Sequence, residues 1–345
     1  MRVGIVGVTG YTGSELLRLL IAHGGVELSY VTSRSYSGRP LAHVHPQYLG
    51  ITELQCSDFS LNEAVEKTDL IFSALPHGES METVPMLVKA GLKVVDLSAD
   101  FRLEEVENYQ HWYGKEHTAP EHLGKAIYGL PELYREKIKS SLMVANPGCY
   151  PTSVILALAP LTQRSLVKWD TLVVDSKSGA SGAGRVPSQV LHYPECTENF
   201  RAYRVARHQH APEMEQEIGR LAGRKVMFTF VPHLVPMVRG ILSTVYVNLA
   251  EQWQEEEIRE LYRQFYQGEK FVRIFPPEFL PETKYVYGSN YCDLYLKLDS
   301  RTGRLIIISV LDNLVKGAAG QALQNMNIML GFPEETGLEA VPLRP

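Results

Sequence analysis

The stretch NPGCYPT, residues 146–152, places a cysteine, Cys149, where a strand is expected to meet a helix. The apolar run SLMVA before it predicts a buried strand, and SVILALAPL after it predicts a helix. Free N–H groups and the helix dipole favour an anion at a helix start, so they lower the pKa of a thiol there. Most free cysteines are instead small buried hydrophobes, which suits Cys56 and Cys292. We expect Cys149 to be a nucleophile.

A nucleophilic cysteine needs a partner that transfers protons, and the segment HQHAPEMEQEI at 208–218 offers two histidines. Pro212 and Glu213 are typical of the first turn of a helix, so His208 and His210 lie at or before its start. A helix N-terminus disfavours imidazolium and keeps such a histidine neutral. We expect His210 to be the acid/base and Glu213 to orient a ring, with His208 as the alternative acid/base. No third ligand follows at a regular spacing, which argues against a metal site.

The loop GVTGYTG follows the first apolar run and contains Gly7, Gly10 and Gly13. Glycines between a strand and a helix allow a tight turn and let the backbone approach a pyrophosphate at the helix N-terminus. At the end of the second strand, Ser33-Arg34-Ser35 replaces the acidic residue that accepts from the ribose 2′-hydroxyl in an NAD site. A guanidinium and two hydroxyls suit a 2′-phosphate, so we expect NADP. The alternative is that Arg34 is a solvated loop residue.

Two further segments have residue types suited to ligand binding. SKSGASGAGR, residues 176–185, has almost no side chains and can lie flat against a ligand, with a flexible hairpin connection as the alternative. In SADFR, Arg102 follows a strand end and is a candidate clamp for an anion; the alternative is a plain surface arginine.

The elements that position these residues are predicted from apolar periodicity. Short apolar runs alternate with helical patterns in the first half, which indicates a parallel sheet with crossover helices. We predict strands at 2–6, 27–32, 70–75, 93–97 and 142–146, and helices at 14–23 and about 79–90. The loops after the five strands would share one carboxyl edge, where such folds bind ligands.

From about residue 168 the pattern changes to longer alternating runs, which predict a largely antiparallel sheet. The closing segment DNLVKGAAGQALQNMNIML predicts a helix that returns to the first domain, with a thin face at residues 317–320. The predicted fold class is α/β: a Rossmann-type parallel sheet domain plus an α+β catalytic domain with a mainly antiparallel sheet.

The composition sets limits on partners and compartment. A chain of 345 residues, 45% hydrophobic, exceeds one compact domain. Its formal charge of −5, without a basic stripe, argues against nucleic acid and favours a small-molecule partner. The four cysteines show no CxxC spacing, which argues against zinc and disulfides. The chain begins unlike a signal peptide, and no run approaches the ~20 apolar residues that span a bilayer. We therefore expect a cytoplasmic protein without membrane contact.

A thiol beside a nicotinamide has a chemical use. A carboxylate is a poor hydride acceptor, whereas a thioester made from an activated acyl group accepts hydride. This logic predicts a reductase that forms an aldehyde. Six motifs in order, GVTGYTGSELLRLL, SALPHG, DLSADFRL, NPGCYPT, SGASGAGR and HQHAPE, resemble the N-acetyl-γ-glutamyl-phosphate reductases of the semialdehyde dehydrogenase family.

The resemblance extends from residue 1 to about 322. It implies the NADPH-dependent reduction of N-acetyl-γ-glutamyl phosphate to N-acetylglutamate 5-semialdehyde through a cysteine thioester, with release of phosphate, in arginine biosynthesis. It implies an NADP-binding Rossmann domain of residues 1–148 and 313–345 and a catalytic and oligomerisation domain of residues 149–312. A homodimer or homotetramer is also implied.

Site residues follow from the resemblance. Cys149 becomes the nucleophile, His210 the acid/base and Glu213 its support. The resemblance implies at the cofactor Gly7, Thr9, Gly10, Tyr11, Thr12, Gly13, Ser14 and Asn313. To these we add, from their residue types, Ser33, Arg34, Ser35, Ser181 and Gly182. Asn313 is expected in the final helix, near the nicotinamide. The resemblance implies Arg102, with Asn146 nearby, as the phosphate site. It does not identify the residues that bind the N-acetyl group, for which our candidates are Arg185, Arg201 and Tyr203.

One departure from the wider family concerns the histidine. In the aspartate-semialdehyde relatives the catalytic histidine follows a VP…GH pattern, whereas here VPMVRGI ends in isoleucine. The role therefore passes to the HQH segment, and the choice between its two histidines stays open.

Three alternative functions remain at this point. The nearest is the same chemistry on a carrier-protein-linked aminoadipyl or glutamyl phosphate, in lysine biosynthesis. A cysteine acyltransferase or hydrolase would use the same Cys–His pair without a dinucleotide loop. A redox-sensing binding module would keep the cofactor and leave the thiol as a spectator.

Overall fold

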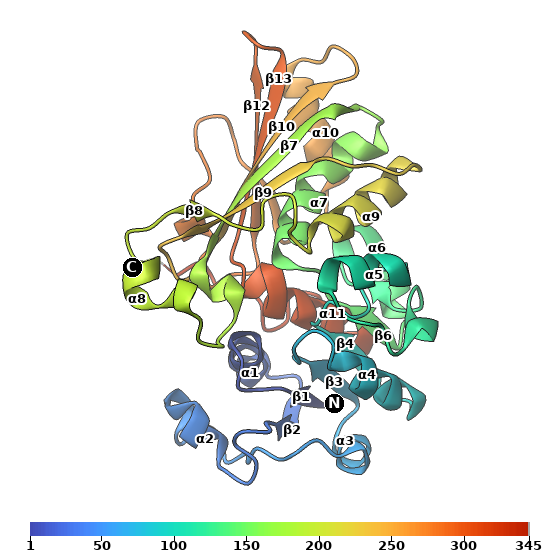
Figure 1. Cartoon of the computed structure of the whole chain (residues 1–345), viewed down its shortest axis with the longest axis vertical. Coiled ribbons are helices and arrows are strands. Elements are labelled where there is room, and N and C mark those ends of the chain that lie inside the picture. The colour runs from blue at the N-terminus through green and yellow to red at the C-terminus, as the bar shows by residue number, and fades with distance from the viewer. Residues whose placement is uncertain (344–345) are drawn as a thin grey trace. The chain divides into compact units, whose positions relative to one another are not determined.

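A computed structural model describes residues 1–343. The chain forms two compact units. In Figure 1 the first is mostly blue to blue-green and the second mostly green to orange. The first contains Met1–Pro147 and Ala318–Glu339, and the second contains Gly148–Gly317 and residues 340–343.

The first unit contains a six-stranded sheet in the order β2-β1-β3-β4-β6-β5, and every pair is parallel. The strands are β1 (Arg2–Val6), β2 (Glu27–Thr32), β3 (Leu70–Ser73), β4 (Lys93–Asp96), β5 (Ile127–Tyr128) and β6 (Met143–Ala145). The five predicted strands are confirmed to within two residues at each end. The short edge strand β5 was not predicted, because two residues are too few to show a period.

Seven helices belong to this unit: α1 (Tyr11–His23), α2 (Leu41–Val44), α3 (Leu61–Lys67), α4 (Ser80–Lys89), α5 (Val106–Tyr113), α6 (Pro131–Lys139) and α11 (Gly320–Leu330). Helix α1 begins three residues before its predicted start, because Gly10 already has the extended backbone of an N-cap. It ends where the sequence indicated, at Gly24, whose φ of 68° requires a left-handed conformation.

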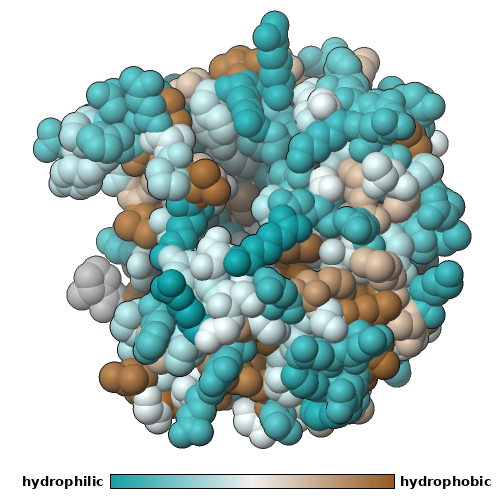
Figure 2. Space-filling view, turned by 60° about the horizontal axis from the view of Figure 1, so that its bottom comes forward, coloured by the Kyte–Doolittle hydropathy of each residue, from teal (hydrophilic) through white to brown (hydrophobic). Residues whose placement is uncertain are grey.

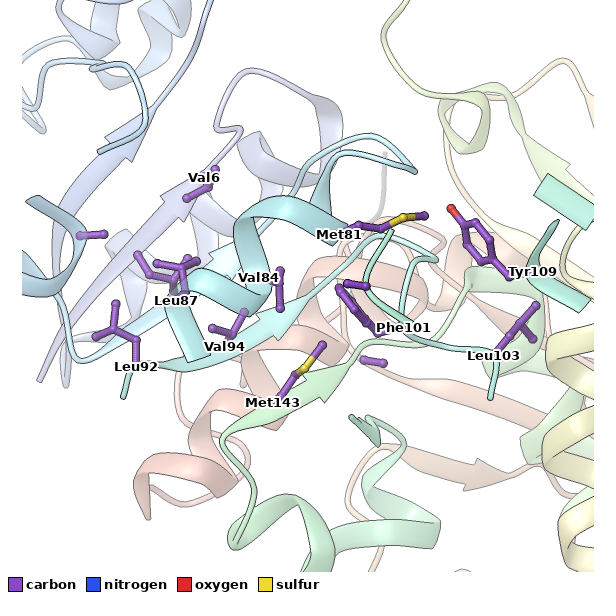
Figure 3. Close-up of a cluster of buried hydrophobic side chains, with 14 of the residues drawn as sticks. Val6, Met81, Val84, Leu87, Leu92, Val94, Phe101, Leu103, Tyr109 and Met143 are labelled. Carbon is purple, nitrogen blue, oxygen red and sulfur yellow. The ribbon is translucent and has the colours of Figure 1, made fainter. Parts of the chain in front are cut away.

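A buried cluster of apolar side chains connects the sheet to the helices of this unit. Val84 and Leu87 of α4 and Val94 of β4 are fully buried, and Figure 3 shows them side by side. Phe101 and Tyr109 extend the cluster toward the segment after β4. Packing of these groups removes apolar surface from water, which stabilises the positions of the strand ends.

The second unit contains a seven-stranded sheet in the order β11-β12-β13-β10-β7-β9-β8. The strands are β7 (Val167–Gly179), β8 (Arg201–Ala202), β9 (Thr229–Val235), β10 (Ile241–Leu249), β11 (Val272–Ile274), β12 (Cys292–Asp299) and β13 (Arg304–Leu311). Only the pairs β7–β9 and β11–β12 are parallel among the strands described. The prediction of a mainly antiparallel sheet is confirmed.

Helix α7 (Cys149–Gln163) packs against β10 and β13 and is almost wholly buried. Figure 1 shows it together with α9 (Ala211–Ala222) and α10 (Glu255–Phe265) along one face of the sheet. The residues of β10 alternate between buried and half-buried. The helices of this unit therefore cover one face, and the opposite face is partly open.

The remaining elements are short. They are α8 (Tyr193–Cys196), the 3₁₀ turns Pro46–Tyr48, Pro120–His122, Ala180–Ala183, Gln189–Leu191 and Thr283–Tyr285, and a π-helical turn, Val315–Ala319. On the face drawn in Figure 2, hydrophilic side chains cover much of the surface and hydrophobic ones lie between them. None of the helices in the described part of the chain has the length and apolar character that crossing a membrane requires.

Candidate active site

Cys149 is the first residue of α7, as the sequence predicted. Gly148 precedes it as the N-cap, with an extended backbone (φ −68°, ψ 157°). Cys149 is half-buried, whereas Cys56 and Cys292 are buried, and burial raises the pKa of the Cys56 thiol. Cys196 is also half-buried, but it is the last residue of α8 and has no helix start beside it. Only Cys149 combines partial exposure with a helix N-terminus among these four.

Glu213 connects the two helices that carry the candidate residues. It lies in the first turn of α9, is fully buried, and its Oε1 accepts a hydrogen bond of 2.8 Å from the N–H of Gly148. Helices α7 and α9 pack together over this contact. Glu213 therefore holds the loop of the candidate nucleophile, a contact that the sequence did not indicate.

His208 and His210 lie together beside the residue that follows Cys149. Their ring centroids are 4.8 Å apart, and the ring of Tyr150 lies 5.4 Å from His208 and 5.9 Å from His210. His208 is buried, whereas His210 is half-buried and forms the N-cap of α9. Burial, with a smaller effect of Arg204, lowers the pKa of His208 to about 3. His208 is therefore neutral near pH 7, which leaves His210 as the better acid/base candidate.

A series of hydrogen bonds runs from these histidines into the interior of the second unit. The backbone N–H of His210 donates to Nδ1 of His208 at 3.1 Å, and Nε2 of His208 lies 3.4 Å from the Tyr203 hydroxyl. That hydroxyl lies 3.1 Å from the hydroxyl of Tyr150, which donates to the His233 carbonyl at 3.3 Å. Burial raises the pKa of Tyr203 to about 12 and that of Tyr150 further, so both stay protonated. The sequence singled out Tyr203 but not Tyr150.

The second glycine-rich loop is held by Asn313. Its side-chain Nδ2 donates to the Ser181 hydroxyl at 2.9 Å, and its Oδ1 accepts from the N–H of Gly240 at 2.8 Å. The N–H of Ser181 also donates to the Val238 carbonyl. Ser181 and Asn313 are buried and Gly182 is exposed, so the backbone of this loop is fixed while its glycine faces solvent.

The expectation that Asn313 belongs to the final helix is wrong. Asn313 lies in a turn directly after β13, within the second unit, and α11 begins only at Gly320. The physical reason is Asp312, whose Oδ1 accepts from the N–H groups of Leu314 and Val315 and so stabilises a turn where a helix was expected.

Gly317, in the π-helical turn that follows, lies against the candidate nucleophile. A Cβ at this position would be 2.8 Å from the Cβ of Cys149 and 3.3 Å from the Asp312 carbonyl oxygen. The sequence indicated a face without bulky side chains at residues 317–320. At Gly317 the structure gives the reason, because any side chain there would collide with Cys149. The turn after β13 thus brings Gly317 against the start of α7, while Asn313 holds the glycine-rich loop.

The first glycine-rich loop has the geometry that a dinucleotide requires. Gly7 has a φ of 92°, and a Cβ there would be 2.7 Å from the Ala74 carbonyl oxygen. A Cβ at Gly13 would be 2.5 Å from the Gly7 carbonyl oxygen, whereas nothing lies within 4 Å of a Cβ at Gly10. Two glycines therefore close the turn, and the third leaves open space at the start of α1. The residues present fit a pyrophosphate at this helix start.

Arg34 follows β2 with its side chain 80% exposed and pairs with Glu79 at 3.0 Å. Ser33 next to it is buried. An exposed guanidinium is accessible to an anionic group, but Glu79 competes for it.

Arg102 and Asn146 lie at neighbouring strand ends of the first unit. Arg102 is only 6% exposed, and its Nη2 donates to the Leu97 carbonyl at 2.8 Å. The backbone N–H of Asn146 donates to the Asp96 carbonyl, the residue before Leu97. The alternative of a plain surface arginine is therefore wrong, because the guanidinium is buried at the carboxyl edge of β4.

A buried carboxylate network, which the sequence did not reveal, joins the loops after β3 and β4. Asp100 accepts from the N–H groups of Gly78 and Ser80 and from the Tyr109 hydroxyl. Asp96 accepts from the hydroxyls of Ser80 and Ser98 at 2.8 and 2.6 Å. Burial raises the pKa of Asp96 to about 6, with a smaller effect of Asp100.

The three residues expected to read the N-acetyl group lie in different surroundings. Arg185 is exposed in the segment after the glycine-rich loop. Arg201 is half-buried on the edge strand β8, and Tyr203 follows that strand. Only Tyr203 joins the histidine cluster by a hydrogen bond among the contacts described above. In residues 1–343 no group of three or more His, Cys, Asp or Glu side chains is placed to hold a metal ion.

Comparisons with known proteins agree with this geometry. Residues 2–141 match the family model "Semialdehyde dehydrogenase, NAD binding domain", and residues 149–313 match "Semialdehyde dehydrogenase, dimerisation domain". The chain is similar to the N-acetyl-gamma-glutamyl-phosphate reductases of Pelotomaculum thermopropionicum and Desulforamulus reducens, each 52% identical over 345 residues. These alignments cover 100% of this chain and 99% and 100% of the two relatives.

Solved structures show the same fold. Aspartate semialdehyde dehydrogenase II from Vibrio cholerae has a TM-score of 0.72 at 17% identity, covering 96% of this chain and 98% of that one. The Candida albicans aspartate semialdehyde dehydrogenase with NADP has a TM-score of 0.68 at 14% identity, covering 95% and 98%.

Proposed function

Since the chain belongs to the semialdehyde dehydrogenase family, we propose that it reduces N-acetyl-γ-glutamyl phosphate to N-acetylglutamate 5-semialdehyde with NADPH, in arginine biosynthesis. The observation that carries this proposal is the position of Cys149 at the start of α7, directly before Tyr150, whose ring contacts those of two histidines, in an oxidoreductase with a nicotinamide-binding domain. The full-length relatives support the substrate.

In the first step the Cys149 thiolate attacks the acyl carbon of the substrate. The C–O bond to phosphate then breaks, inorganic phosphate leaves, and a thioester forms on Sγ. The N–H groups at the start of α7 face the oxyanion of the tetrahedral intermediate and stabilise it. Arg102 and Asn146 are our candidates for holding the departing phosphate.

In the second step the thioester becomes an aldehyde. The reduced nicotinamide, when bound, supplies a hydride to the thioester carbon. His210 donates a proton to the resulting oxyanion and takes it back as the C–S bond breaks, so the aldehyde leaves and the thiolate is restored. His208 is unsuited to this task because its pKa of about 3 keeps it neutral.

For the cofactor, we propose that the GVTGYTG loop and the start of α1 hold the pyrophosphate and that Arg34, with Ser33 and Ser35, holds the 2′-phosphate. The open space at Gly10 and the exposure of the Arg34 side chain support these assignments. The other proposed cofactor residues are Thr9, Tyr11, Thr12, Ser14, Ser181, Gly182 and Asn313. Arg185 and Arg201 remain proposed contacts of the substrate.

We also propose a homodimer or homotetramer. The family model that matches residues 149–313 describes a dimerisation domain, and the second sheet has one face that its own helices do not cover. We propose a cytoplasmic location as well, where reducing conditions keep a nucleophilic cysteine in its thiol form.

The test is the reverse reaction, with N-acetylglutamate 5-semialdehyde, phosphate and NADP⁺ followed by the absorbance of NADPH. We expect phosphate-dependent reduction of NADP⁺, and a loss of at least about 10³-fold in kcat for Cys149→Ser. Cys196→Ser changes another half-buried thiol and should keep activity within about twofold.

Substrate competitors distinguish the alternatives. Faster turnover of an aminoadipate semialdehyde would favour the carrier-linked substrate instead. No NADPH signal, with Cys149-dependent hydrolysis of the acyl phosphate, would contradict the proposal and favour a hydrolase.

A further inference from the structure

A series of hydrogen bonds runs from the His233 carbonyl to the backbone N–H of His210. The groups at the two ends of this series determine which atom donates in each bond. At one end a backbone carbonyl, that of His233, can only accept, so the Tyr150 hydroxyl donates to it. Since the single hydroxyl proton of Tyr150 is given to this carbonyl, Tyr150 accepts from the hydroxyl of Tyr203. The Tyr203 hydroxyl then has no further proton to donate. Tyr203 must accept from Nε2 of His208.

The other end requires the same direction. The backbone N–H of His210 can only donate, so Nδ1 of His208 is its acceptor and carries no proton. A neutral His208 therefore has its proton on Nε2, the atom that faces Tyr203. Both ends of the series specify one tautomer without conflict.

We propose that Tyr203 and Tyr150 are positioning residues: their hydroxyls fix the tautomer and ring orientation of His208, which holds the backbone N–H of His210 at the start of α9. This inference rests on the proposed function, in which His210 is the acid/base. It assigns to Tyr203 a role toward His210 in place of a contact with the N-acetyl group.

Burial makes this arrangement rigid. The ring of His208 contacts those of Tyr150, Tyr203 and Phe230 at centroid distances of 5.4, 5.5 and 5.6 Å, so it packs on three sides. A buried polar atom that loses its partner costs about 1–3 kcal/mol, which favours the single tautomer that satisfies all members of the series.

The titratable groups that interact with His208 or His210 include Tyr150 on α7 and Tyr203 and Arg204 on the segment after β8. Cys149 acts on both tyrosines through its charge, and Glu213 lies in the first turn of α9, the helix that His210 caps. The cation among them, Arg204, disfavours a proton on His208, which agrees with its neutral form. A fixed neutral ring beside His210 leaves the proton chemistry to His210 alone.

The test compares Tyr203→Phe and Tyr150→Phe with a matched control. Tyr262 of α10 is fully buried, as Tyr150 is, and its hydroxyl donates to the Ala157 carbonyl of α7, so Tyr262→Phe removes a comparable buried hydroxyl elsewhere along that helix. We expect kcat of the first two variants to fall at least about tenfold with KM within about twofold, because His210 is misplaced while substrate binding is kept. Tyr262→Phe should keep kcat within about twofold.

The tautomer gives a readout that does not depend on turnover. Nitrogen NMR of histidine-labelled wild-type protein should show His208 as the Nε2–H tautomer, without protonation down to about pH 4. In Tyr203→Phe we expect a mixture of tautomers. If the wild-type protein does not act on N-acetylglutamate 5-semialdehyde, the proposed function fails. The tautomer of His208 measured by NMR still tests whether Tyr203 and Tyr150 fix that ring.

A second pair of variants separates positioning from proton transfer. His208→Asn places an amide oxygen near the position of Nδ1 and can still accept from His210, whereas His208→Leu cannot. We expect at least about tenfold higher kcat for the asparagine variant. Equal activity of the two variants, a His208 that carries its proton on Nδ1, or unchanged kcat in both tyrosine variants would each overturn the proposal.

Discussion

At the scale of single residues, contacts between atoms far apart in the sequence set the geometry of the thiol. Gly317 leaves no room for a Cβ beside Cys149, and the Glu213 carboxylate accepts from the N–H of Gly148. The thiol is therefore confined on one side by a glycine and held at its loop by a buried carboxylate. We propose that the choice of cofactor also depends on few residues, chiefly on Arg34.

We predict that Arg34→Ala raises KM for NADPH at least about tenfold and leaves KM for NADH within about twofold, because the guanidinium meets only the 2′-phosphate. Steady-state kinetics with both cofactors measures this. Glu79→Gln is the matched variant, since it removes the carboxylate that pairs with Arg34, and should lower KM for NADPH. An equal loss with both cofactors after Arg34→Ala would contradict the assignment of the 2′-phosphate.

At the scale of elements, the candidate residues gather where strands end and helices begin. Cys149 follows β6 and opens α7, and the dinucleotide loop follows β1 and opens α1. The carboxylates of Asp96 and Asp100 hold the corresponding loops after β3 and β4 together. Because Asp96 is fully buried, this junction makes the stability of the fold depend on pH.

The folded state raises the pKa of Asp96 from 3.8 to about 6, so it binds this proton more tightly than the unfolded state does. The contribution of Asp96 to the free energy of unfolding is therefore largest below about pH 4 and falls by about 3 kcal/mol as the pH rises through 6. We predict that Asp96→Asn removes this decrease. The stability of the wild type relative to the variant should then fall by about 2 kcal/mol between pH 4 and 7, measured by urea unfolding.

The same substitution at Asp58, which is exposed, controls for the loss of a charge. If the wild type and Asp96→Asn keep a constant difference in stability over this pH range, Asp96 does not titrate as described.

At the scale of the whole molecule, the partly open face of the second sheet is the surface on which we propose that a second copy packs. Val173 of β7, Tyr246 of β10 and Ile306 of β13 are aligned across three neighbouring strands. Within the single chain Val173 is exposed, and Tyr246 and Ile306 are half-buried. A row of apolar side chains on an uncovered sheet face marks an interface between proteins. The dimerisation description of the matching family model agrees with this use.

We predict that Ile306→Glu shifts the protein from a dimer or tetramer toward the monomer, because a carboxylate would be buried in the interface without a partner. Sedimentation velocity at several protein concentrations measures the assembly state. Met227→Glu adds the same charge at a side chain that is 79% exposed outside the sheet and should leave the assembly unchanged. An unchanged assembly after Ile306→Glu would place the interface on another surface.

Local patterns alone sufficed for much of this protein. Short apolar runs predicted five strands of the first sheet, and Gly24 predicted the end of α1, because periodicity and helix breakers are properties of short segments. The same holds for Cys149 at a helix start, and the family resemblance is confirmed by relatives that are 52% identical over the full length.

Only the tertiary structure decided what depends on contacts between distant segments. Tyr150 and Tyr203 are 53 residues apart, and Gly148 and Glu213 are 65 apart, so no local pattern pairs them. Asn313 was placed in the wrong element because the Asp312 carboxylate stabilises a turn in a segment of helical composition. Sequence therefore determined which elements form and which residue types they carry, whereas packing of those elements decided which side chains share hydrogen bonds and lose contact with water.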